Sequence, residues 1–192
     1  TRTVAVGYQA LFTQDANASA YNVAIGYKAG YATTTGGQNT FLGYSSGSAN
    51  TTGQSNVALG SGSLLANTVG NENISVGKGS LGANVDGSKS VAIGHNSLFV
   101  QDPSSATDMF NVALGHRAGV AVTTGVQNTL IGGSSGDVVT TGSQNTAIGY
   151  NTSFSSATAS NQTVIGNGAT GHGDNKMTLG NGSVVNIEPG AT

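Results

Sequence analysis

An aliphatic residue followed directly by glycine recurs along this chain, mostly at intervals of 17 residues. These glycines are Gly7, Gly26, Gly43, Gly60, Gly77, Gly94, Gly115, Gly132, Gly149, Gly166 and Gly180. A period this short, rich in strand formers and interrupted by Gly, Asn and Thr, is typical of a solenoid in which each repeat forms one turn. The sequence therefore predicts an all-β fold, a parallel β-solenoid or β-roll of about eleven turns.

The residues around each glycine keep their chemical character from one repeat to the next. The residue directly before each glycine and the residue three positions before it are mostly aliphatic or β-branched, as Ile25 and Val23 are before Gly26. Side chains two apart on a strand point the same way, so we expect these two columns to form the core. Most repeats have an asparagine four positions before the glycine, as at Asn22. We expect these stacked amides to hydrogen-bond from turn to turn.

The residue between the two aliphatic positions is small and mostly apolar. On a strand it points to the opposite face, where a solvent-exposed column would be polar. An apolar stripe on a rod is expected to be covered, and a second copy of the rod is the nearest partner. We therefore predict a parallel homo-oligomer, a trimer. Its predicted interface is formed by Ala24, Phe41, Ala58, Ala92, Ala113, Leu130 and Ala147.

A longer repeat is superimposed on the short one. The segment 38–43 returns 89 residues later as the segment 127–132, which indicates that five turns have been duplicated. We predict one solenoid domain over residues 1–192, with a five-turn unit at about 4–90, its copy at about 91–170 and a closing turn at 171–192. The two longest steps, which reach Gly26 and Gly115, predict protruding loops at 12–20 and 99–110.

Charge and cysteine content narrow the classes of partner. Six basic and eight acidic residues among 192 leave no basic patch for nucleic acid or an anionic membrane surface, and no cysteine is present. No apolar run is long enough to span a bilayer, so we expect no membrane insertion. Unbroken aliphatic columns and low charge argue against disorder. Because the chain begins with Thr1, we expect it to be a fragment or a processed product.

The sequence offers weak support for catalysis or metal binding. Asp102 and Asp108 share a loop and are the only suggestive carboxylate pair of the kind that glycan depolymerases use. His95 and His116 occupy one column in consecutive turns and can stack or bind a metal, and stacking is favoured because no third ligand accompanies them. We predict a protein that is not an enzyme, with no catalytic, metal or cofactor residues.

Two segments carry a resemblance to a known family. The repeats at 22–30 and 145–150 resemble the N-T-A-I-G-Y repeats of bacteriophage tail fibres, and the likeness extends along essentially the whole chain. They are also similar to the heads of trimeric autotransporter adhesins, whose left-handed parallel β-rolls form trimers. The segment 177–184 resembles the turn that precedes a self-cleaving chaperone domain in many phage fibres. The resemblance implies a structural protein, extracellular or on the virion surface, that acts in host attachment.

Contacts with a host glycan or protein are expected in the two loops and along one aromatic column. The loop residues are Phe12, Asp15, Asn17, Phe99, Asp102, Asp108 and Phe110. The three phenylalanines can alternatively fill the bases of the loops. Tyr27, Tyr44 and Tyr150 are candidates for stacking against sugars.

Two other functions remain open at this point. A bacterial trimeric surface adhesin head would have the same architecture. An ice-binding solenoid is a candidate of a different class, because Thr-Thr pairs recur at 34–35, 51–52, 123–124 and 140–141. The intervening turns interrupt that array, which favours a corner ladder over an ice-binding surface.

Overall fold

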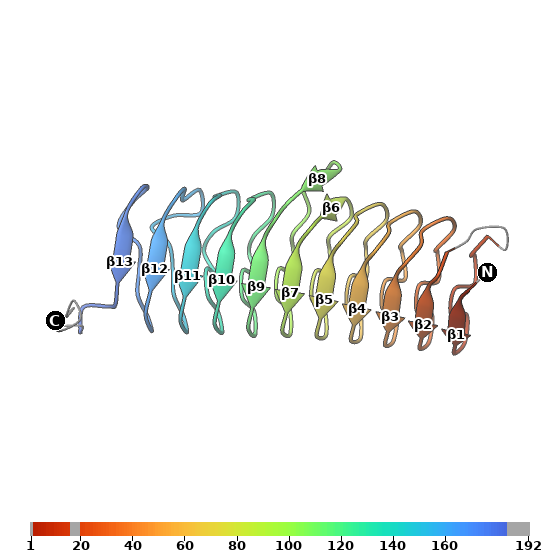
Figure 1. Cartoon of the computed structure of the whole chain (residues 1–192). Helices are drawn as coiled ribbons and strands as arrows, with labels where there is room; N and C mark the ends of the chain where they lie inside the picture. Colours follow the sequence, from red (N-terminus) through yellow and green to blue (C-terminus); the bar gives the residue numbers. More distant parts are fainter. Residues whose placement is uncertain (1, 16–19, 184–192) are drawn as a thin grey trace, which may run out of the picture.

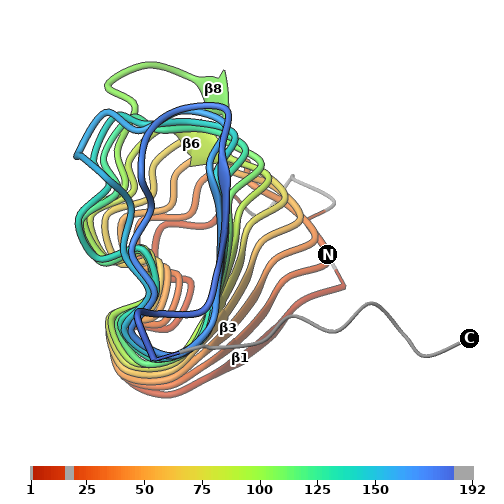
Figure 2. The ribbon, with the colours of Figure 1, turned by 90° about the vertical axis from the view of Figure 1, so that its left-hand side faces the viewer.

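The computed structural model describes residues 2–15 and 20–183, and these residues form a straight rod of stacked turns (Figure 1). Viewed along the rod, successive turns nearly superimpose (Figure 2). The strands found in the described residues are β1 (Val4–Val6), β2 (Val23–Ile25), β3 (Thr40–Leu42), β4 (Val57–Leu59), β5 (Ile74–Val76), β6 (Gly87–Ser88), β7 (Val91–Ile93), β8 (Thr107–Asp108), β9 (Val112–Leu114), β10 (Thr129–Ile131), β11 (Thr146–Ile148), β12 (Thr163–Ile165) and β13 (Met177–Leu179).

Within these residues, eleven strands form one parallel sheet in chain order, and only β6 and β8 lie outside it. Pairing is in register: Val23 of β2 faces Thr40 of β3, and Thr40 faces Val57 of β4. The prediction of an all-β parallel solenoid is confirmed, with ten turns separating the first strand of the sheet from the last. The described residues contain no helix that is long and apolar enough to cross a membrane.

The interior of the roll is occupied by the central residue of each strand. From β2 to β12 in the main sheet this residue is buried, as Ala24 and Phe41 are, whereas the residues on either side of it are partly or fully exposed. The expectation that the flanking aliphatic columns form the core was therefore wrong. A roll this thin has a narrow interior, so most of the central side chains are small, and each large one inside is matched by small residues beside it.

Large and small residues are matched across this core. Phe41 fills the room beside Gly30 and Gly47, where an added Cβ would lie 2.6 Å from Phe41 Cδ2 at Gly30 and would overlap the Phe41 ring at Gly47. Leu130 lies in the same way between Gly119 and Gly136, 89 residues further along. The turns of β4, β5 and β7, with Ala or Ser at the centre of the strand, instead carry a buried leucine six residues later; these are Leu64, Leu81 and Leu98.

Buried asparagines hold consecutive turns together, as expected. Asn39 N donates to Asn22 Oδ1 at 2.8 Å, and Asn22 Nδ2 donates to the Gly36 carbonyl at 2.8 Å. Each amide thus bonds mainly to the backbone of the next turn. A second buried column, which the sequence analysis missed, links Asn67 Nδ2 to Asn50 Oδ1 at 2.8 Å. These bonds satisfy polar groups that would otherwise be buried without partners.

The corners of the turn require glycine for two reasons. Gly43 has φ of +137°, and a Cβ there would lie 2.7 Å from the Gly60 backbone carbon. Gly36, at the other corner, does not have positive φ, but a Cβ would lie 2.5 Å from the Gly53 carbonyl oxygen. Close approach of the next turn therefore excludes a side chain at both corners.

Candidate interaction surfaces

The predicted oligomer interface lies inside the roll. Ala24, Phe41, Ala58, Ala92, Ala113, Leu130 and Ala147 are completely buried within the single chain. These side chains have no surface to offer a partner, so the assignment of this column to an interface was wrong. The oligomer prediction was argued from this same column, so its burial removes that argument. A different apolar stripe is exposed on the other side of the strands.

The aliphatic stripe consists of the first and third residues of strands β1–β5, β7 and β9–β13. All of its side chains are partly or fully exposed; Leu42 is 46 % exposed and Leu114 is 44 % exposed. The stripe contains aliphatic residues, four threonines and Met177, and it has no charged residue. Ten turns of ~4.8 Å and a width of ~7 Å give a flat footprint of roughly 300 Å². Apolar patches of this size and larger commonly mark binding surfaces.

The exposed tyrosines form a ladder along one edge. Tyr8 stacks on Tyr27 with ring centroids 5.4 Å apart, and Tyr27 stacks on Tyr44 at 5.1 Å. Both faces of the Tyr27 ring are therefore covered by other rings. Tyr44 ends the ladder and has one face without a ring partner, because Ser61 occupies the same position on the next turn. Tyr150 is exposed further along the rod.

The two histidines of this column also stack. The rings of His95 and His116 have centroids 5.3 Å apart and an interplanar angle of 11°. In the described part of the chain, no group of three His, Cys, Asp or Glu side chains is arranged to hold a metal ion. Stacking is the interaction that the structure shows for this pair.

The first predicted loop is only partly described, and Asn17 lies outside the described residues. Phe12 is exposed and stacks on Tyr31, with centroids 5.6 Å apart. Asp15 is also exposed. The buried residue at the base of this loop is Leu11, so Phe12 does not fill it.

The second loop rises from the rod at β8, which pairs with β6 (Figure 1). Lys89 Nζ forms an ion pair with Asp108 Oδ2 at 2.7 Å and lies 5.4 Å from the centre of the Phe110 ring. The hydrogen bond to Asp108 raises the pKa of Lys89 above its ordinary value. Phe110 is half exposed, and Met109 is buried in its place. Asp102 Oδ1 accepts a 3.4 Å hydrogen bond from Ser104 N, so the two loop aspartates have different partners.

The remaining loop residue, Phe99, lies in a groove shared with Tyr44. The groove also contains Leu65, Lys78 and Asn96, which the sequence analysis did not select. The sequence contained one indication of this groove: the aromatic column that contains Tyr44 is interrupted at Ser61.

The threonine pairs are engaged within the rod. Thr51 Oγ1 donates to the Thr68 carbonyl at 3.0 Å, and Thr123 Oγ1 donates to the Thr140 carbonyl at 3.2 Å. The first hydroxyl of these pairs therefore links adjacent turns and favours the corner-ladder interpretation over ice binding. Comparisons of the chain with protein-family models, curated proteins and solved structures found no match.

Proposed function

We propose that this chain is a stiff structural segment of an extracellular or virion-surface appendage, without catalytic activity, that assembles as a parallel homotrimer and serves in attachment to a host surface. The observation that carries the proposal is the aliphatic stripe. An uncharged apolar stripe that runs the length of a rod is costly to leave in water, at ~25 cal/mol for each Å² of apolar surface.

A second copy of the same chain is the partner that fits this stripe best. Its side chains recur at the pitch of the turns, so a parallel copy presents the same spacing over the whole length. A globular partner would match only part of it. The resemblance of the repeats at 22–30 to those of tail fibres and adhesin heads supports three copies around one axis.

The solution mass tests the assembly directly. The wild-type chain should have a mass of about 56 kDa, three times 18.8 kDa, by light scattering at micromolar concentration. The double variant Leu42→Lys/Leu114→Lys places two charges on the stripe and should dissociate to a monomer while retaining its β-sheet circular dichroism. Thr52→Lys/Thr141→Lys adds the same charge at exposed residues off the stripe and should remain trimeric.

The possible results separate the parts of the proposal. A wild-type monomer would refute assembly through the stripe, and a wild-type dimer would refute the three-fold arrangement. Dissociation of the Thr52/Thr141 control would show that charge alone, rather than the stripe, governs assembly. Binding of the trimer to host cells then tests the attachment role.

A further inference from the structure

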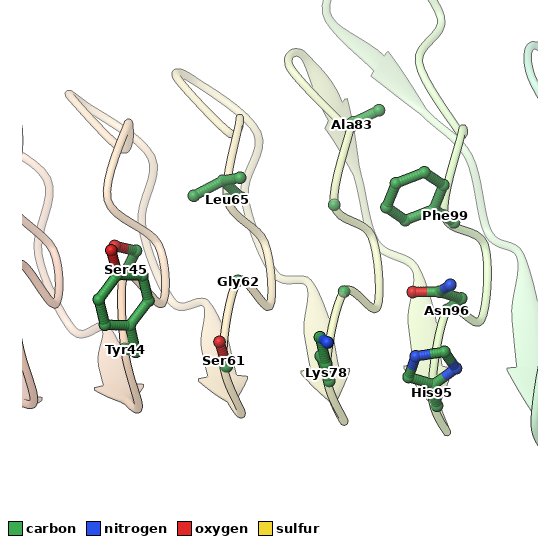
Figure 3. Close-up of a pocket in the computed structure, with 12 residues that line it drawn as sticks. Tyr44, Ser45, Ser61, Gly62, Leu65, Lys78, Ala83, His95, Asn96 and Phe99 are labelled. Atoms are coloured by element: carbon green, nitrogen blue, oxygen red, sulfur yellow. The ribbon is translucent and has the colours of Figure 1, made fainter.

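A groove of about 610 Å³ lies across the turns that follow β3, β4, β5 and β7. In Figure 3 the strands run behind it, with Tyr44 at one end, His95 and Phe99 at the other, and Ser61 and Gly62 between them. None of its lining residues belongs to the aliphatic stripe. Its volume is within the range of small-molecule binding sites.

The groove exists because two neighbouring side-chain columns both lose their bulk in the turn after β4, and one of them also does so in the turn after β5. Ser61 follows Tyr44 where another ring would continue the ladder. Gly62 and Gly79 follow Ser45 in the adjacent column, and a Cβ at Gly62 would meet nothing within 4 Å. Space is therefore open directly above Gly62, whereas the Asn96 side chain lies against Gly79.

Aromatic surfaces bound this space at both ends. Tyr44 stacks on Tyr27 with one face and has no ring on the other, and His95 stacks in the same way on His116. The exposed ring of Phe99 adds a third apolar surface. A pyranose ring has an apolar C–H face and a rim of hydroxyl groups, so it can pack on such rings while its hydroxyls meet water and polar side chains.

The polar groups of the groove favour a negative charge on the ligand. Lys78 is exposed, and its ammonium group makes no hydrogen bond or ion pair with the described residues. No aspartate or glutamate lines the groove. The Asn96 amide lies at the same end as His95 and can donate a further hydrogen bond. A carboxylate on a sugar would pair with Lys78 through a charge-assisted hydrogen bond.

We infer that this groove binds an acidic sugar, a carboxylate-bearing pyranose or a short oligosaccharide that contains one. Tyr44 and Phe99 lie three turns, or ~14 Å, apart, so in an oligosaccharide different sugar units pack their C–H faces on the two rings, and the carboxylate pairs with Lys78. This inference deepens the attachment role proposed above and rests on it: the groove is the site at which the rod meets a surface glycan.

The test measures binding of two oligosaccharides that differ only in one carboxylate. A glucuronate-containing oligosaccharide and its glucose-containing counterpart are titrated into the full chain, with binding followed by calorimetry and by ligand-observed NMR. The glucuronate form should bind more tightly. Lys78→Ala should remove the difference between the two sugars, and Tyr44→Ala should weaken both by about tenfold.

A filling variant tests the groove without removing any of its contacts. Ser61→Tyr restores the ring that the ladder lacks, and its equivalent 89 residues later is already Tyr150. This variant should fold normally and lose sugar binding. Tyr21→Ala, at another exposed tyrosine, and Lys176→Ala are matched controls outside the groove, and they should bind as the wild type does.

The outcomes distinguish this inference from the proposed function. A trimer that binds neither sugar, or one in which Ser61→Tyr binds normally, would overturn the groove assignment and leave the assembly proposal standing. Equal binding of polyglutamate would show that charge alone is recognised and would also overturn it. Sugar binding by a monomeric wild type would instead support the groove and refute the trimer.

Discussion

Replacing Phe41 by alanine tests how the narrow core is filled. The ring is completely buried, and Gly30 and Gly47 on either side have no side chains that could move into the space. Phe41→Ala should therefore lower the free energy of unfolding by about 3–5 kcal/mol, the range for phenylalanine deletions in cores that cannot collapse.

A compensating change can be copied from the next turns of the same protein. Leu64 and Leu81 occupy the position equivalent to Gly47, with φ of 51° and 46°, and Gly47 itself has φ of 55°. A leucine at this position can therefore adopt the backbone that Gly47 already has, at a cost of about 1–2 kcal/mol. The double variant Phe41→Ala/Gly47→Leu should recover about 2 kcal/mol of the loss. Gly47→Leu alone should destabilise the fold, because its side chain would overlap the Phe41 ring.

Equilibrium urea denaturation followed by far-UV circular dichroism provides the comparison. All variants should be measured at one protein concentration and checked for the same solution mass, because dissociation would add its own free energy. A double variant no more stable than Phe41→Ala would refute the reasoning that large and small residues are exchangeable between these two positions.

Two further predictions concern hydrogen bonds between turns. Asn56→Ala should destabilise the fold by about 1–3 kcal/mol for each buried group left unpaired, because Asn56 Nδ2 donates to the Gly70 carbonyl and Asn56 Oδ1 accepts from Asn73 N, and chemical denaturation measures this loss. The second prediction concerns Asp174, whose pKa is held below its ordinary value of 3.8 by the hydrogen bond that its carboxylate accepts from Ser160 N. The stabilisation from this hydrogen bond is present above pH 3.8 and is lost as the pH falls through the lower, folded-state pKa. The difference in Tm between wild type and Asp174→Asn should therefore shrink between about pH 5 and pH 2, and a constant difference would contradict the prediction.

The period of the sequence predicted the fold because pairing and hydrogen bonding recur with that same period. Asn39 bonds to Asn22 across 17 residues, and the strands pair over the same interval. The alternation of side chains on a strand, however, defines two faces without indicating which is inside. Both faces here are apolar, so burial could not be assigned from hydrophobicity. The reciprocal placement of Phe41 beside Gly30 and Gly47 contained the missing information.

The candidate groove was harder to predict than the fold. Tyr44 and Phe99 lie on turns that are not adjacent and at different positions within the repeat, and they line one groove only because of the path of the chain between strands. The interruption of the ladder at Ser61 was visible in the sequence, but its significance depends on which columns lie beside it. Loop contacts such as the ion pair of Lys89 with Asp108 depend on an irregular segment for which the period gives no rule.

The bonds between turns also make the length of the rod a quantity that can change in fixed increments. Each turn presents to the next the same amide, carbonyl and strand that it receives from the previous one, so duplicating a whole turn would lengthen the rod by ~4.8 Å without leaving a polar group unsatisfied. Extra residues within a turn are tolerated differently: Val4 pairs with Val23 and Val91 pairs with Val112 in the same register, although these steps exceed 17 residues. Such a chain can evolve its reach by copying units and its surface chemistry by inserting residues, with little interference between the two.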